Sequence, residues 1–448
     1  MINLYYHVLT AFFVYGFLFY GEWLLQPVLD KREPPLLKHK VPLLGDFIGL
    51  VRKGPEYYTA VARKTRPACF TLDIFGTRTY TVNTSQIIHS IQRNAKTLSF
   101  APLIPYMAER IAGLRSELWK TWFADSGRYN EGMGAEHARL IHHTLYPPEG
   151  TRQMNHDVLA ELKPLMDDIG SWEPTLGIHK WVVHVDYKAG NPGASTLVTM
   201  RRKLFEDHGF KVQDIAQFEA GMSTPILSNT APALFWLLRE IYSRPRFLRA
   251  VRTEIGRAVE RKVLEDGQVV LTLNVPRLKK DCPLLLGTYH EVLRQHGIGM
   301  SARRVIEDTI CNRKDFDAAR FVRTDDAFKD EDGPGPGPGP GHGPSGLHKP
   351  ISRPAHSFRS FGGEGGAPHL CPGRQIATLE ILCIAAMLIA RYDVDPVLGH
   401  WSYPKLTYIM SGIAMPSTDI QVRMNPLVET EGDWSSEMGP HHLKFGLA

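Results

Sequence analysis

The sequence predicts a mainly α-helical protein with a small β region, of the α+β class. Four segments place apolar residues at spacings of three and four, as on the buried face of a helix: 154–170, 212–243, 244–262 and 282–297. A further apolar helix is expected from just after Cys371 to about Arg391. Residues 68–83 alternate apolar and polar side chains around a Gly-Thr turn, which predicts a β-hairpin.

Charge and cysteine usage narrow the class of protein. The 448 residues carry a net charge of +5, too small a basic excess to indicate nucleic-acid binding. The five cysteines are scattered and include no C-x-x-C pair, so a zinc site is not indicated. This usage fits a reducing compartment.

The N-terminus resembles a membrane anchor. No formally charged side chain occurs before Glu22, and roughly 20 apolar residues can span a bilayer as one helix. Residues 1–25 are therefore interpreted as a transmembrane anchor, since no signal-peptide cleavage pattern is visible. Basic residues within 31–40 predict that the rest of the chain faces the cytoplasm. The alternative is a buried amphipathic helix.

Composition divides the remaining chain into a connector and a folded domain. Residues 26–45 are proline-rich and predict a stiff hinge. Residues 46–448 are expected to form one domain. Within it, residues 333–346 alternate Gly and Pro, which permits neither helix nor sheet and predicts an exposed loop.

Cys371 lies between a glycine-rich stretch and the start of the last helix. Pro372 suits a first helical turn, and the glycines allow close approach of a flat, bulky group. Free amides and the positive end of the helix dipole are expected to lower the pKa of the thiol and favour the thiolate. The alternative is a small buried cysteine before a core helix.

The run "FGGEGGAPHLCPGRQIA" resembles the haem-ligand loop of the cytochromes P-450. The resemblance implies that Cys371 is the axial thiolate ligand of haem b. It further implies insertion of one oxygen atom from O2 into a lipophilic molecule: a sterol, a fatty acid or an intermediate of secondary metabolism. It also implies an NADPH-dependent flavin reductase as electron donor and attachment to the endoplasmic reticulum membrane by a single span.

Two further motifs carry the resemblance on the side of the ligand. Glu291 and Arg294 match the family's E-x-x-R pair, and Arg320 in "DFDAARFV" would join them in a buried structural triad. The same spacing occurs at three other Glu–Arg pairs, and the sequence that follows selects this one. Arg303 and His369 match positions that bind the haem propionates.

The run "GMSTPILSNTAPALFWLL" resembles the helix on the oxygen side of the haem, most closely in the subgroup of cholesterol 7-alpha-hydroxylase and prostacyclin synthase. Asn229 and Thr230 match the acid–threonine pair that relays protons to oxygen. Pro232 would open the helix and expose carbonyl groups. The alternative is that both side chains only bond to the preceding turn.

The chain departs from the family pattern at three places. Residues 191–210 have room for one helix where the family has two, and a strand-rich segment is missing near 306–315. Phe361 stands ten residues before Cys371 instead of seven. The distal lid and part of the β region are therefore expected to be truncated, in a shortened gene product or in a divergent enzyme with an open pocket.

Two other functions stay open. An isomerase acting on a lipid peroxide would need no reductase, and the missing acid beside Thr230 is compatible with it. A non-catalytic haem-binding remnant would follow from the truncated lid. For the monooxygenase, basic residues near the ligand loop are candidates for docking an acidic reductase: Lys349, Arg353, Arg359 and Arg374. The alternative is that they are ordinary solvated surface charges.

Overall fold

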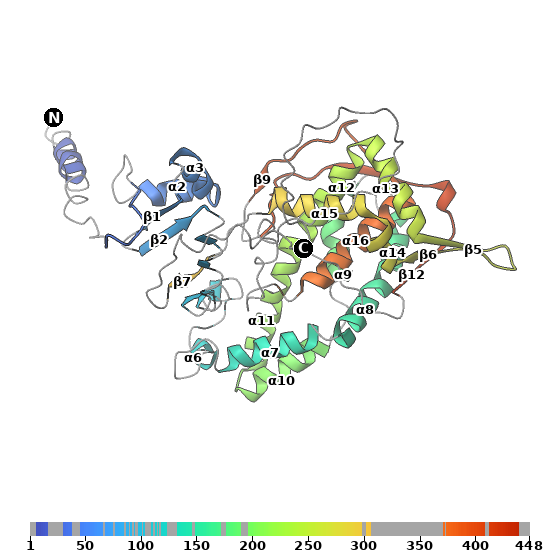
Figure 1. Ribbon diagram of the computed structural model, residues 1–448, viewed down its shortest axis with the longest axis horizontal. Helices are drawn as coiled ribbons and strands as arrows, with labels where there is room; N and C mark the ends of the chain where they lie inside the picture. Colours follow the sequence, from blue (N-terminus) through green and yellow to red (C-terminus); the bar gives the residue numbers. More distant parts are fainter. Residues whose placement is uncertain are drawn as a thin grey trace, which may run out of the picture. The chain divides into compact units, whose positions relative to one another are not determined.

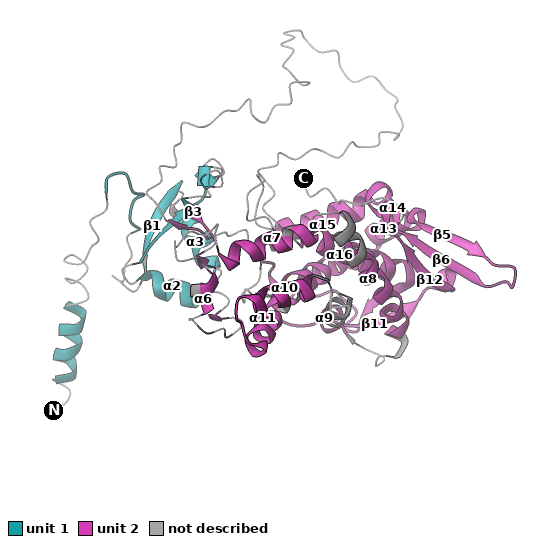
Figure 2. Cartoon of the chain, turned by 90° about the horizontal axis from the view of Figure 1, so that it is seen from below, with its two compact units in different colours: residues 1–97, 307–357 teal, residues 98–306, 358–448 magenta. Residues whose placement is uncertain are grey.

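The structure is a computed structural model in which two compact units are distinguished (Figure 2). The first comprises Met1–Thr97 with Glu307–Ser357, and the second Leu98–Ile306 with Phe358–Ala448. The described residues are 6–16, 30–37, 45–65, 68–74, 77–84, 87–88, 90–91, 94, 97–100, 102–103, 109–110, 113, 115, 118–122, 132–145, 148–171, 176–189, 196–297, 302–305, 371, 373–407 and 412–438.

The first unit is built on the predicted hairpin, which is confirmed. Strands β1 Cys69–Ile74 and β2 Thr77–Val82 pair antiparallel (Figure 1). Helices α2 Gly45–Lys53 and α3 Glu56–Thr65 precede them. The small core of this unit contains Tyr57, Val61, Phe70 and Leu72. Alternation in the strands places Phe70 and Leu72 on the same buried face.

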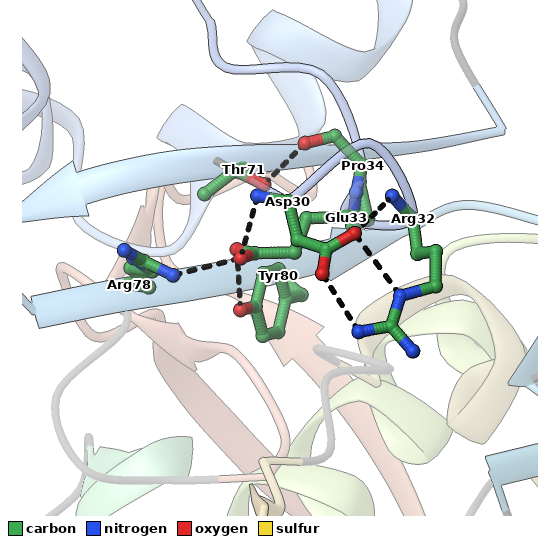
Figure 3. Close-up of polar contacts among 7 residues, drawn as sticks. All are labelled: Asp30, Arg32, Glu33, Pro34, Thr71, Arg78 and Tyr80. Carbon is green, nitrogen blue, oxygen red and sulfur yellow. Dashed lines mark hydrogen bonds and ion pairs between the residues drawn. The ribbon is translucent and has the colours of Figure 1, made fainter. Parts of the chain in front are cut away.

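Part of the predicted hinge is attached to this hairpin (Figure 3). The Glu33 carboxylate accepts hydrogen bonds from Arg78 and from the Tyr80 hydroxyl, both at 2.8 Å. The Thr71 hydroxyl donates to the carbonyl oxygen of Pro34 at 2.7 Å. Residues 30–37 are thus hydrogen-bonded to the hairpin and do not form a free hinge before it.

The predicted anchor overlaps a short helical segment, residues 6–16, whose side chains are mostly exposed. Over the described parts of the chain, the structure contains no helix that combines the length and the apolarity needed to span a bilayer.

The second unit is mainly helical. Its helices are α6 Leu118–Trp122, α7 Met133–Leu145, α8 Pro148–Asp167, α9 Ile178–Ala189, α10 Thr196–Asp207, α11 Val212–Pro225, α12 Ala231–Tyr242, α13 Pro245–Ala258, α14 Val275–Asp281, α15 Pro283–His296 and α16 Arg374–Arg391. A π-helical turn, Ile226–Thr230, joins α11 to α12, and short 3-10 turns occupy Asp168–Ser171 and Val428–Thr430.

Small sheets complete this unit. Antiparallel pairs are formed by β3 Leu98–Ser99 with β7 Arg304–Val305 and by β9 Leu406–Thr407 with β10 Met415–Pro416. In the order β4-β11-β8, the strands are Leu176–Gly177, Gln421–Pro426 and Tyr392–Pro396. In the order β12-β6-β5, they are Asp433–Glu437, Val269–Asn274 and Val259–Val263.

Helix α16 is the central element of the core. Its residues from Thr378 to Ile389 are all buried, and it packs against α8, α12, α13 and α15. A helix that is apolar on every side must be surrounded by other elements. This burial fixes the start of α16, which follows Cys371 by three residues.

The predicted helices are found, with one informative difference. The segment 244–262 was expected to be helical throughout, but α13 ends at Ala258 and β5 follows. Val259 to Val263 pair with β6, so tertiary pairing overrides the helical pattern at this end. Between 191 and 210 the structure describes one helix, α10, as the sequence predicts.

Candidate functional site

Cys371 lies just before α16, and the backbone N–H groups at the start of this helix act on its sulfur. Gly373 is the N-cap residue, and the Arg374 guanidinium donates to the Cys371 carbonyl oxygen at 3.0 Å. Burial raises the pKa of the Cys371 thiol, although the N–H groups of Gly373 and Arg374 and the Arg374 charge act to lower it. The expectation of a lowered thiol pKa is therefore wrong for the protein alone, because desolvation outweighs the amides.

This environment fits a thiolate ligand to a metal. Cys371 is half-buried, and the backbone N–H groups of Gly373 and Arg374 already favour negative charge on its sulfur. A coordinated metal deprotonates such a thiol outright. A Cβ built on Gly373 would meet, among described atoms, only the Cys371 sulfur, at 4.0 Å. Iron ligation by Cys371 stays a prediction.

A buried hydroxyl pair supports this first turn of α16. The Tyr289 hydroxyl, on α15, lies 3.1 Å from the Thr378 hydroxyl, and Thr378 also donates to the Arg374 carbonyl oxygen at 2.7 Å. Both side chains are buried. Sequence analysis missed Tyr289, since its partner lies on another helix and no local pattern marks it.

The second predicted part of the site is an interruption in a long helix. Helix α11, the π-helical turn Ile226–Thr230 and α12 follow each other without a break. Pro232 has no N–H group and cannot continue the regular ladder, which accounts for a wider turn directly before it. This π turn contacts α16, so the two predicted halves of the site lie on neighbouring elements.

Asn229 and Thr230 lie together at the end of the π turn. Thr230 is buried, whereas Asn229 is half-buried. The Asn229 amide group donates to the Ser228 hydroxyl at 3.3 Å, and its carbonyl oxygen accepts from the Gly412 backbone N–H at 2.6 Å. The Asn229 side chain is therefore bonded to a distant segment, which the sequence did not predict.

The two predicted propionate ligands have different outcomes. Arg303 precedes β7, and its guanidinium carbon lies 5.7 Å from the centre of the Phe100 ring. Desolvation lowers the pKa of Arg303, so a nearby anion would stabilise its charge. His369 lies outside the described residues, and the propionate role of both stays a prediction.

The predicted buried triad is described only in part. Glu291 and Arg294 form a bidentate pair, at 2.8 and 2.6 Å, on α15. Their side chains are 38% and 54% exposed. Arg320 lies outside the described residues, so the buried triad stays a prediction. The pair alone contributes little to stability.

The basic cluster is described only in part. Arg374 turns its guanidinium toward the Cys371 carbonyl oxygen. The other three members, Lys349, Arg353 and Arg359, lie outside the described residues, as does the loop 333–346. Docking of a reductase by these residues stays a prediction.

Fold and site together define the class of protein. It is mainly helical, a cysteine directly precedes its central buried helix, and a neighbouring helix contains a π turn. No protein-family profile matches the chain. Curated proteins do match it. It is 28% identical to "Cytochrome P450 monooxygenase nodJ" of Hypoxylon pulicicidum, over 96% of this chain and 97% of that protein.

Two further relatives are also named as cytochrome P450 monooxygenases. A "Cytochrome P450 monooxygenase" of Gibberella zeae is 21% identical over 84% of both chains. "Cytochrome P450 monooxygenase poxD" of Penicillium oxalicum is 22% identical over 92% of this chain and 98% of that protein. The chain is a fungal-type member of the cytochrome P450 monooxygenase family, a family of haem-dependent oxidoreductases.

The same comparisons bear on the missing segments. The match to nodJ extends over 512 residues, more than the 448 of this chain. That relative therefore carries internal residues that this chain lacks, in agreement with the gaps inferred from the sequence.

Proposed function

We propose that this protein inserts one oxygen atom from O2 into a lipophilic small molecule, with electrons from NADPH delivered by a flavin reductase. The balanced reaction converts a C–H group, O2, NADPH and a proton into an alcohol, water and NADP⁺. The observation that carries the proposal is the placement of Cys371 and the π turn on contacting elements, in a chain related to three P450 monooxygenases.

The cofactor would be haem b, held by the Cys371 sulfur and by Arg303 and His369 at its propionates. When bound, haem supplies the activation of O2. The backbone N–H groups of Gly373 and Arg374 stabilise negative charge on the sulfur, and the buried Tyr289–Thr378 contact fixes the turn that carries them.

On the opposite side, Asn229 and Thr230 would handle oxygen and protons. Thr230 is buried at the end of the π turn, and its hydroxyl is the group that would hold a proton there. Asn229, next to it, lacks the acidic group usual in the family, so the proton must reach Thr230 from solvent by another route.

The substrate class and the location complete the proposal. A sterol, a fatty acid or an intermediate of secondary metabolism would be the substrate. The domain would face the cytoplasm at the endoplasmic reticulum membrane, attached by the apolar N-terminal residues. The exposed Phe12, Phe13 and Tyr15 of the helical segment 6–16 support contact with lipid.

Turnover under ¹⁸O₂ tests the proposal. The full chain, loaded with haem and mixed with a flavin reductase and NADPH, should place one labelled atom in lauric acid or cholesterol. No labelled product, together with rearrangement of a lipid hydroperoxide without reductase, would establish the isomerase instead. The carboxamide of Asn229, in place of an acid, is the observation that keeps this second function open.

A further inference from the structure

The surplus positive charge of the chain is concentrated in one short stretch. Residues 244–263 carry seven basic and two acidic side chains, a balance of +5. The whole chain has 52 basic and 47 acidic residues, so the rest of the chain carries 45 of each and balances to zero. The stretch forms α13 and β5, which follow one another directly. Electrostatic attraction of a partner by this protein therefore originates mainly here.

The basic side chains form a row on the outer side of α13. The buried side of this helix packs against α12, α15 and α16. Spacings of three and eight residues place Arg246, Arg249 and Arg257 together on the exposed side. Arg261 and Lys262 continue the exposed row into β5 (Figure 1). These five residues are called the basic row.

The basic row lacks carboxylate partners, unlike its basic neighbours. Arg244 pairs with Glu240 at 2.5 Å. Arg252 pairs with Asp393 at 2.6 Å. No member of the basic row forms a salt bridge or a side-chain hydrogen bond with another residue that the structure describes. Like charges on one helix face destabilise it, so an anionic partner would relieve this repulsion.

The chemistry of the basic row indicates an acidic protein as that partner. Three of its members are arginines, whose planar guanidinium binds a carboxylate through two parallel N–H groups. No large apolar side chain is exposed within residues 244–262, whereas helices that bind membrane surfaces insert such side chains. The net charge of +5 is also too small a basic excess to indicate nucleic acid.

The middle of α13 is bonded to the end of α16 that is remote from Cys371. The Arg252 guanidinium donates to the Ile389 and Tyr392 carbonyl oxygens at 2.9 and 2.7 Å. About 22 Å of helix separate Ile389 from Arg374, the first residue of α16. An electron donor must approach the Cys371 end, so the basic row suits a different protein.

We propose that the basic row is a docking surface for an acidic protein that is not the electron donor and that presents a row of carboxylates. Glutamates three and four residues apart on a helix lie about 6 Å from one another, which matches arginines carried at helical spacing on α13. The inference goes beyond the proposed function and requires no haem.

Binding of an acidic peptide to the full chain tests the proposal. The probe is a fluorescent helical peptide with glutamates three and four residues apart along one side, followed by anisotropy at low salt. Arg246→Glu combined with Arg249→Glu should weaken binding about tenfold, the factor expected for two surface ion pairs. Acidic side chains near the start of a helix are favoured by its dipole, so this double variant should fold. Unchanged peptide binding overturns the proposal.

The matched control reverses two charges outside the basic row. Lys203, on α10, and Lys211, just before α11, are exposed and form no salt bridge with another described residue. Lys203→Glu combined with Lys211→Glu lowers the net charge of +5 by four, as the first double variant does, and should leave peptide binding unchanged. Equal weakening in both double variants would reflect net charge alone and would overturn the docking surface.

Three further measurements test the class of partner. Phosphatidylserine vesicles and a DNA duplex are compared with the peptide at equal anion concentration. Tighter binding of either one, lost in the double variant on α13, would overturn the assignment to an acidic protein. Slower haem reduction by a flavin reductase in that variant, and not in the control, would identify the row as the electron donor's site and overturn the proposal as well. The peptide experiment is decided without haem, so a chain that takes up no haem would contradict only the proposed function.

Discussion

The two sides of the candidate site differ in how far apart in sequence their parts lie. At the start of α16, the groups that act on the Cys371 sulfur are two and three residues further along the chain. At the π turn, the Asn229 side chain is bonded to Gly412, 183 residues later. The Cys371 side is a local motif, whereas the Asn229 side is assembled by the tertiary fold. Truncation elsewhere in the chain should therefore disrupt the Asn229 contacts before it disrupts those of Cys371.

The largest expected effect lies on the assembled side. Thr230→Ala removes the buried hydroxyl at the end of the π turn and should lower product formed per NADPH on the order of 10²-fold, the scale of a lost proton-transfer group. Thr230→Ser should retain most of the product, since it keeps the hydroxyl. Product yield and hydrogen peroxide are measured together. Equal yields from wild type and Thr230→Ala would remove Thr230 from the mechanism.

A smaller effect is expected for Tyr289, which supports the first turn of α16 next to Cys371. Tyr289→Phe removes the contact with Thr378 and should lower the free energy of unfolding by about 1 kcal/mol in urea. It should also shift the haem absorption, because the turn that carries the ligand loosens.

The matched control for Tyr289 is Tyr242, on α12, which contacts the other end of α16. Tyr242 is buried and its hydroxyl bonds to the Leu388 and Tyr392 carbonyl oxygens. Tyr242→Phe should cost a similar free energy and leave the haem absorption unchanged. A spectral change of equal size in both variants would show that Tyr289 acts only through global stability.

The smallest expected effect concerns His296, whose carbonyl oxygen accepts from the Ala414 N–H. Both of its ring nitrogens are buried without a hydrogen-bond partner among the described residues. His296→Phe keeps the stack on Trp236 and removes these nitrogens, so it should raise the free energy of unfolding by about 1 kcal/mol or less at neutral pH. Chemical unfolding measures this, and a loss of stability would indicate that a bound water satisfies the imidazole.

His296 also predicts a pH dependence with a definite sign. Burial lowers the pKa of His296 to about 4, and the nearby Glu240 and Arg239 charges act in opposite directions. In the unfolded chain its pKa is roughly 6.5. Between these values the unfolded state binds a proton that the folded state does not, so stability falls as pH falls from 6.5 to 4. His296→Phe should lose this part of the acid sensitivity. The buried His137 and the half-buried His179, whose pKa values are also lowered by burial, keep theirs.

The sequence predicted what depends on local patterns. The hairpin 69–82, the helix after Cys371 and the helix interrupted before Pro232 are all present, since alternation, apolar spacing and proline act within a few residues. It could not predict how exposed the Glu291–Arg294 pair is, 38% and 54%, because exposure depends on which elements pack around α15. The raised thiol pKa of Cys371 likewise depends on packing around α16. The Asn229–Gly412 hydrogen bond depends on the tertiary fold, which brings together residues 183 positions apart.

The central claim is that the Cys371 sulfur ligates haem iron, and the carbon monoxide difference spectrum of the reduced protein tests it most directly. Wild type should show the long-wavelength Soret band of a thiolate-ligated haem, and Cys371→Ser should lose it. Cys383→Ser, which changes a fully buried cysteine further along α16, should keep the band. A wild-type protein that takes up no haem, or a Cys371→Ser variant that retains the long-wavelength band, would contradict the assignment.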